Sequence, residues 1–219
     1  MTKTVRIATP CYAGQVQFRY LLGVVQMFQD LGVLGSPFAL EAIDGAPGQL
    51  VTNRNVLLTR ALGVRDLDVL LWVDADCAPV YSDPSVLYRF LQEATQTGVA
   101  VVGAACARRA EGNRPGAGRN LVPLAEESEP RPQYAPFEVR SVGLGFTAWN
   151  MRWWRASLLD TPIVDEAMHH FEWRGGVSED YRSCEFVRQR GGKLLVDPRI
   201  GTWHDGMTVE ASVGRVAWA

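Results

Sequence analysis

The sequence predicts an α/β fold in which helices cover both faces of a mostly parallel central sheet. In the first half of the chain, strand-like segments alternate with segments of helical periodicity, as is typical of parallel sheets. The segment Val69–Val73 is uninterrupted apolar sequence, as expected for a strand buried on both sheet faces. The chain has 219 residues, 47% hydrophobic and 21% charged, which fits a single folded domain over residues 1–219.

Periodicity predicts two strand–helix units at the start of the chain. The β-branched run VRIATP indicates a first strand that ends at Pro10. A second strand is expected from Phe38 to Ile43, followed by Asp44, and then a helix that carries Asn53 and Arg54 on its polar face. Between the two strands, helical spacing predicts a core-facing set of Val24, Val25, Phe28 and Leu31.

The elements of the middle and C-terminal parts carry clear boundary signals. Asp83 and Pro84 predict the start of a helix, because aspartate caps helix N-termini and proline fits the first turn. Val99–Ala105 predicts a further buried strand, and Gly191 closes a helix expected from Glu179 to Arg190. We expect strands in FEVRSVGLGFTAWN and KLLVDPRI and a short helix in RWWRASLL.

Two segments lack periodicity. Residues 107–136 are rich in Gly, Pro, Arg and Glu, and we expect a long surface loop there that orders on ligand binding. Residues 207–219 form a C-terminal tail without a predicted element.

Composition indicates in which compartment the protein is expected and which kinds of partner it favours. The net charge of −2 and the pI of about 5.9 do not indicate a polyanionic partner, although they allow a local basic patch. No apolar run is long enough to span a bilayer, and the N-terminus lacks the pattern of a secretory signal. We therefore expect a cytoplasmic protein without a membrane partner. Four scattered cysteines without a CxxC pair are expected to stay free thiols: Cys11, Cys77, Cys106 and Cys184.

Two carboxylates follow the buried apolar strand in VLLWVDADCAPV. Asp74 and Asp76 are two residues apart at a strand end, so both can reach one hard cation through oxygen atoms. A divalent cation there would neutralise the charge of a departing nucleoside diphosphate. The alternative is an ordinary turn, because aspartate is common where strands end.

A second acidic pair lies in GGVSEDYRSCEF. Ser178 fits a helix N-cap, and Glu179 and Asp180 fall in the first turn, where the helix dipole favours negative charge. This placement alone explains both acids as residues that stabilise the start of the helix.

Other candidates are single residues. His204, in TWHDG, is either structural or a metal ligand that suits Mn²⁺ and is compatible with Mg²⁺. Gly143 and Gly145 permit either close approach of a ligand to the backbone or a strand kink. The adjacent His169 and His170 point apart and are expected at the surface or facing an acceptor. Trp149, Trp153 and Trp154 fit either stacking on a sugar or base or packing in the core.

The order of these motifs resembles the GT-A-fold glycosyltransferases, which have a Rossmann-like sheet, and in particular the family 2-like members of bacteriophages and bacteria. The likeness rests on ATPCY, Asp44, VTNRN, VDAD, VGLGFTAWN, SED and WHDG, in that order, over most of Val5 to Gly206. The loop and the tail match nothing in the family pattern.

The resemblance implies a metal-dependent hexosyltransferase that takes a sugar from a nucleotide-sugar, expected to be a UDP-sugar. Asp180 would be the general base of an inverting reaction, and Glu179 would position the acceptor. Asp76 would bind Mn²⁺ or Mg²⁺ directly, Asp74 would contact the ribose or the metal, and His204 would complete the metal site. The remaining donor-site residues implied are Thr9, Pro10 and Tyr12 at the base, Asp44 at the base or ribose, Arg54 at the base or phosphates, and Gly143 and Gly145 beside the sugar.

Alternatives remain for the identity of the acceptor and for the class of reaction. A hydroxymethylated base in phage DNA is one candidate acceptor, with loop contacts to phosphate from Arg108, Arg109, Arg114 and Arg119, and a saccharide or small molecule is the other. Pro10 and Arg54 also have plain interpretations, as a strand end and a solvated helix residue. A nucleotidyltransferase on a related fold and an inactive binding module are the alternatives to a glycosyltransferase.

Overall fold

The computed structural model describes most of the chain, and the fold is taken from those residues. They are residues 2–11, 14–33, 35–105, 121–123, 134–160, 163–164, 167–168, 170–172, 177–204, 207–209 and 216–218. The helices are α1 (Phe18–Leu31), α2 (Leu50–Gly63), α3 (Pro84–Glu93), α4 (Met151–Ser157) and α5 (Glu179–Gln189). The strands are β1 (Lys3–Cys11), β2 (Phe38–Pro47), β3 (Val69–Val73), β4 (Cys77–Val80), β5 (Val99–Ala105), β6 (Leu121–Pro123), β7 (Phe137–Val142), β8 (Phe146–Asn150), β9 (Ile163–Val164), β10 (Ala167–Met168), β11 (Lys193–His204), β12 (Met207–Val209) and β13 (Val216–Trp218).

The main sheet runs in the order β13-β12-β11-β5-β8-β3-β1-β2. β1 pairs in parallel with both β2 and β3, and β11 pairs in parallel with β5. β8 lies antiparallel between β3 and β5. The predicted fold class is therefore confirmed, with one antiparallel strand inserted into an otherwise parallel centre.

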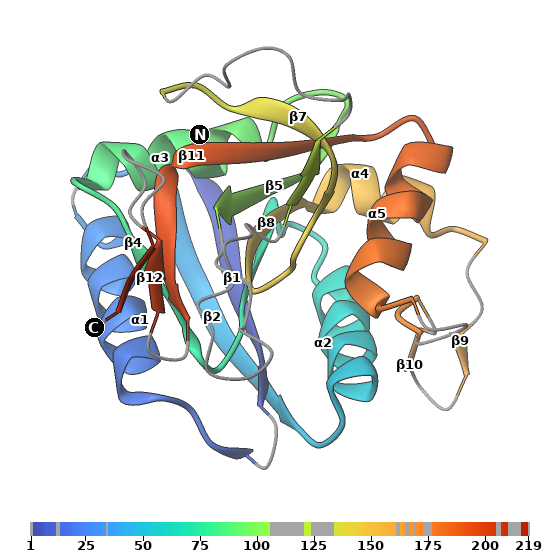
Figure 1. Ribbon diagram of the computed structural model, residues 1–219. Coiled ribbons are helices and arrows are strands. Elements are labelled where there is room, and N and C mark those ends of the chain that lie inside the picture. The colour runs from blue at the N-terminus through green and yellow to red at the C-terminus, as the bar shows by residue number, and fades with distance from the viewer. Residues whose placement is uncertain are drawn as a thin grey trace.

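Helices cover both faces of this sheet (Figure 1). α1 and α3 pack on one face, and α2, α4 and α5 pack on the other. In β3, Leu70 and Trp72 join the core on the α2 side, while Leu71 and Val73 join the core on the α1 side. This strand is buried on both faces, as its uninterrupted apolar sequence predicts.

The core face of α1 differs from the predicted one. Val24 and Leu31 are buried as expected, together with Tyr20 and Met27. Val25 and Phe28, however, are 53% and 58% exposed. Apolar residues occur on two stripes of this helix, so periodicity alone selects a core stripe that is rotated from the real one.

Several predicted boundaries also change. The segment FEVRSVGLGFTAWN is not one strand: β7 and β8 are separated by a turn over residues 143–145 and have different neighbours in the sheet. The predicted loop contains β6, which pairs with β7, and the predicted tail contains β12 and β13. Asp44 lies within β2 rather than after it, and β1 continues past Pro10 to Cys11.

Asp83 caps α3 as predicted: its carboxylate accepts a hydrogen bond from Ser85 N at 2.9 Å, and Pro84 is the first helical residue. The described cysteines Cys11, Cys77 and Cys184 are free thiols, as expected, and Cys106 lies outside the described residues. In the described part of the chain, no helix is both long and apolar enough to span a membrane.

Candidate functional site

Three consecutive polar residues of α2 are buried. Asn53, Arg54 and Asn55 are 2%, 1% and 6% exposed, so the interpretation of Arg54 as a solvated helix residue is wrong. The Asn55 side-chain amide donates to Phe171 O at 2.9 Å and accepts from Phe171 N at 2.8 Å. These two hydrogen bonds fix the backbone at Phe171 against α2. Asn53 Nδ2 donates to Gly48 O at 3.0 Å, in the turn before the helix. These contacts hold the start of α2 in place, and the Arg54 side chain points into the protein.

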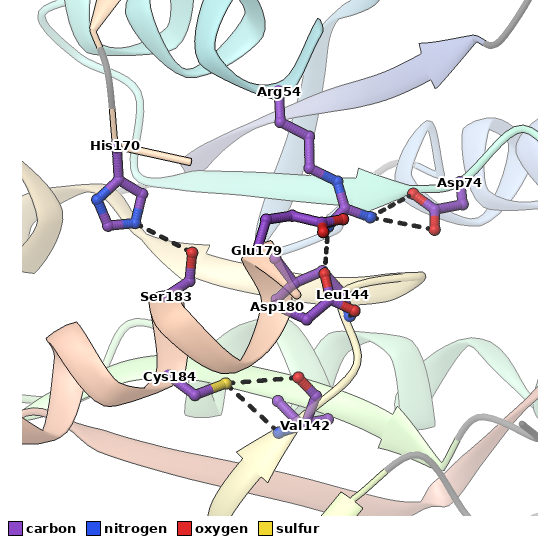
Figure 2. A network of polar contacts seen from close by, with 9 residues as sticks. All are labelled: Arg54, Asp74, Val142, Leu144, His170, Glu179, Asp180, Ser183 and Cys184. Atoms are coloured by element: carbon purple, nitrogen blue, oxygen red, sulfur yellow. Dashed lines mark hydrogen bonds and ion pairs between the residues drawn. The ribbon is translucent and has the colours of Figure 1, made fainter. Parts of the chain in front are cut away.

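The Arg54 guanidinium joins three carboxylates from two separate motifs (Figure 2). Its Nη2 donates to Asp74, at 3.0 Å from Oδ1 and 3.2 Å from Oδ2. Its Nη1 donates to Glu179 Oε1 at 3.3 Å and also to Asp180 Oδ1. Burial by itself lowers the pKa of Arg54, but the three carboxylates outweigh it and raise the pKa above its ordinary value. The guanidinium therefore stays charged and connects the end of β3 to the start of α5.

Glu179 and Asp180 lie in the first turn of α5, as predicted. Ser178 is the N-cap residue, but its side chain makes no capping hydrogen bond. Glu179 is only 4% exposed, and its burial raises the pKa of its carboxyl group, an effect that Arg54 opposes. The Asp180 side chain keeps 20% of its surface exposed. Of the two acids, Asp180 is the one that a solute can reach.

The backbone of the turn between β7 and β8 forms hydrogen bonds with both acidic motifs. Leu144 N donates to Asp180 Oδ2 at 3.2 Å, and Asp74 N donates to Gly145 O at 2.9 Å. A Cβ on Gly145 would lie 3.1 Å from Cys77 Sγ and 3.5 Å from Asp74 Oδ2. Glycine at this position thus leaves space beside the Asp74 carboxylate. Gly143 is buried in the same turn.

A tight turn presents Asp74 and Asp76 at the end of β3. Cys77 N donates to Asp74 O at 2.8 Å, and both aspartates are partly buried. In the backbone, His204 is paired with Cys77, so β11 and β4 bring residue 204 next to the turn. The side chain of His204 lies outside the described residues.

Asp74 and Asp76 are the carboxylates that this turn could offer to a hard divalent cation. Among the side chains that the structure describes, no three ligating groups converge. Two carboxylates nevertheless flank the turn, Gly145 leaves room beside one of them, and the Arg54 cluster holds three acids against one cation. Asp74 and Asp76 are therefore the residues that could hold Mn²⁺ or Mg²⁺.

Other predicted residues lie at the ends of β1 and β2. Thr9 and Pro10 are buried near the end of β1, and the Thr9 hydroxyl is hydrogen-bonded to Tyr20 Oη at 2.5 Å. Asp44, on the edge strand β2, pairs with Arg6 Nη1 at 3.1 Å. Tyr12 lies outside the described residues. Parallel pairing of Ala8 with Asp44 and with Trp72 brings these ends to the sheet edge where Asp74 lies.

His170 belongs to an aromatic cluster rather than to the surface. Its ring packs edge-on against Trp154 and Phe186, with centroids 5.0 and 4.8 Å apart, and His170 Nε2 is 3.1 Å from Ser183 Oγ. Burial lowers its pKa to about 4. Trp149 and Trp154 are fully buried and stacked on each other, which decides for core packing. His169 and the four loop arginines, Arg108, Arg109, Arg114 and Arg119, lie outside the described residues.

Two participants were missed by sequence reasoning. The backbone N–H of Leu144 binds Asp180, and a backbone donor has no signature in the side-chain sequence. Arg6 pairs with both Asp44 and Glu41, and strand alternation could have suggested this pairing once β1 and β2 were taken as neighbours.

Comparison with known proteins supports the fold class. No protein-family model matches the chain, and no curated protein matches it. Among solved structures, A197 from STIV superimposes with a TM-score of 0.62 at 17% identity, over 99% of this chain and 94% of that one. A mutant of the Drosophila β-1,4-galactosyltransferase 7, in complex with manganese, UDP-Gal and xylobiose, gives a TM-score of 0.48 at 13% identity, over 89% and 65%. The chain thus shares an α/β architecture with A197 over nearly the full length of both proteins.

Proposed function

We propose that this protein is a metal-dependent glycosyltransferase that moves a sugar from a nucleotide-sugar, a UDP-sugar in the first instance, to an acceptor hydroxyl. The observation that carries the proposal is the convergence of two acidic motifs on Arg54. Asp74 belongs to the pair suited to a cation, and Asp180 to the pair suited to a general base. Sugar transfer needs these two functions within one site.

The donor would bind along the sheet edge at the ends of β1, β2 and β3. Asp74 and Asp76 would hold Mn²⁺ or Mg²⁺, with His204 as the further ligand, and the cation would neutralise charge on the departing diphosphate. Thr9, Pro10 and Tyr12 would border the base, and Asp44 would accept hydrogen bonds from the base or ribose. Gly143 and Gly145 would allow the sugar close to the backbone.

Asp180 would remove the proton from the acceptor hydroxyl. The acceptor oxygen then bonds to the anomeric carbon while the bond from that carbon to the diphosphate oxygen breaks, which inverts the configuration. Asp180 suits this role because it is partly exposed and its second oxygen is oriented by Leu144 N. Glu179 is too buried to meet the acceptor and would position Asp180 through Arg54.

The first acceptor to test is a hydroxymethylated base in duplex DNA. Its support is the resemblance to bacteriophage members and the four arginines of the segment 107–136. Gel-shift binding that weakens with salt would support this acceptor, whereas absent or salt-indifferent binding would favour a saccharide or small molecule.

The experiment that tests the function measures nucleoside diphosphate released from UDP-, GDP- and dTDP-sugars with Mn²⁺. We expect release from one donor that is abolished by EDTA and by Asp76→Ala. Asp66→Ala is the matched control, because Asp66 is an exposed carboxylate near the opposite end of β3. Pyrophosphate release from a nucleoside triphosphate would instead indicate a nucleotidyltransferase. If none of these nucleotides bound in calorimetric titration, the proposal would fail and a binding module would take its place.

A further inference from the structure

The two ends of the Arg54 guanidinium serve different parts of the proposed site. We call Asp74 the donor side, and Glu179 with Asp180 the acceptor side. Nη2 contacts only the donor side among the described residues, and Nη1 contacts only the acceptor side. In Figure 2 the side chain descends from α2 between the two, with Asp74 on one flank and the start of α5 on the other.

Arg54 is surrounded by more negative charges than its single positive charge can balance. Three carboxylates surround a single guanidinium that is almost completely buried. Asp74 directs both of its oxygens to Nη2, at 3.0 and 3.2 Å. A cation bound at Asp74 would weaken the contact of this carboxylate with Arg54, because two positive groups would share one negative charge and repel each other.

We propose that Arg54 is a positioning residue that makes cation binding on the donor side and the setting of Asp180 on the acceptor side depend on each other. This inference rests on the proposed function. When a cation takes Asp74, Arg54 loses its donor-side partner and pairs more strongly with Glu179 and Asp180. Asp180 is anchored at its other oxygen by Leu144 N, so the change strengthens its contact with Nη1 without releasing it. Asp180 would then reach its final position only when a cation is bound at Asp74.

The forked shape of arginine is what this role requires. A guanidinium presents separate N–H groups in a rigid plane and can hold two partners on different sides, whereas a lysine ammonium is a single point charge. Arg54→Lys therefore keeps the positive charge that the buried carboxylates need but removes the connection between the two sides. This substitution therefore distinguishes a role of Arg54 in coupling the two sides from a role in balancing the charge of the carboxylates.

The test is calorimetric titration of the full chain with Mn²⁺ alone, without nucleotide, at pH 8. Asp180→Asn removes the negative charge of an acceptor-side partner, so Arg54 should hold Asp74 more tightly. We expect Mn²⁺ affinity to fall by about 5-fold or more, the lower end of typical coupling between sites. In the Arg54→Lys background, the same substitution should change the affinity by less than about 2-fold, since the connecting fork is gone. Glu185→Gln, which removes an exposed carboxylate of the same helix, should change it by less than about 2-fold in either background.

The outcomes separate this inference from the proposed function. An equal effect of Asp180→Asn in both backgrounds would mean that the carboxylate acts through space, and would overturn the role of Arg54. Unchanged Mn²⁺ affinity in Asp180→Asn would overturn it too, even if wild-type protein still releases nucleoside diphosphate with Mn²⁺. If wild-type protein releases nucleoside diphosphate without any cation, the metal part of the function fails and the coupling fails with it.

A second variant covers the case in which Arg54→Lys does not fold. Glu179→Gln removes the other partner of Nη1 and should also lower Mn²⁺ affinity, whereas Glu185→Gln should not. Equal affinities of these two variants would overturn the proposal.

Discussion

Two polar networks lie on opposite faces of the sheet, and they are built differently. On the α1 side, the carboxylate of Asp30 accepts hydrogen bonds from neutral donors, Tyr81 Oη at 2.6 Å and Gln26 Nε2 at 2.9 Å. On the α2 side, one guanidinium meets three carboxylates. The first network pairs a single carboxylate with neutral donors, one from the same helix and one from Tyr81. The second joins the end of β3 to the start of α5 and keeps an excess of negative charge around one guanidinium.

The largest effect is expected from removing the shared cation. Arg54→Gln leaves Glu179, Asp74 and Asp180 without their counter-ion, and breaking a buried ion pair in this way costs about 3–5 kcal/mol. Urea unfolding should show this loss in the free energy of unfolding. The control Arg89→Gln changes an exposed arginine of α3 and should cost less than about 1 kcal/mol. Equal losses in the two variants would show that Arg54 contributes no more to stability than an exposed arginine.

A second effect concerns pH, through His170. Its pKa is about 4 in the folded protein against an ordinary value of 6.5, so the unfolded chain takes up a proton first as the pH falls. Stability from this group is complete above about pH 6.5 and is lost between pH 6.5 and 4, by at most about 3 kcal/mol. In His170→Phe, the free energy of unfolding should depend less on pH across that window. An unchanged slope in the variant would contradict the burial of this imidazole.

A smaller cost is expected on the α1 side. Asp30→Asn keeps one acceptor for its neutral donors, so we expect a loss of about 1–2 kcal/mol in the free energy of unfolding. Nucleoside diphosphate release should stay at the wild-type rate, because Asp30 lies across the sheet from the proposed site. A large loss of turnover in a folded Asp30→Asn variant would show that the two networks are not independent.

The smallest effect has the opposite sign. Burial raises the pKa of Glu179, so its charged form destabilises the fold once the pH exceeds the ordinary value near 4.5. In EDTA at pH 7, Glu179→Gln should therefore be as stable as wild type or more stable by up to about 1 kcal/mol. At pH 4 this advantage should vanish. A marked loss of stability at pH 7 would indicate that the Glu179–Arg54 pair stabilises the fold.

The strand–helix alternation, the doubly buried β3 and the acidic first turn of α5 follow from local sequence patterns. The antiparallel insertion of β8 does not, because pairing between distant strands leaves no local periodicity. The core stripe of α1 could not be chosen because two apolar stripes compete. In the site, the acids were identified by residue type, but the partner of Arg54 was not. Which carboxylates meet a guanidinium depends on how α2, β3 and α5 pack.

The most direct test of the proposed site is a crystal structure with UDP and Mn²⁺, in which the anomalous signal of manganese locates the cation. We predict one strong peak beside the turn that carries Asp74 and Asp76, with the diphosphate next to it and the base toward Asp44. Manganese and nucleotide bound elsewhere, or a turn that stays empty at saturating concentrations of both, would contradict the assignment of this sheet edge as the donor site.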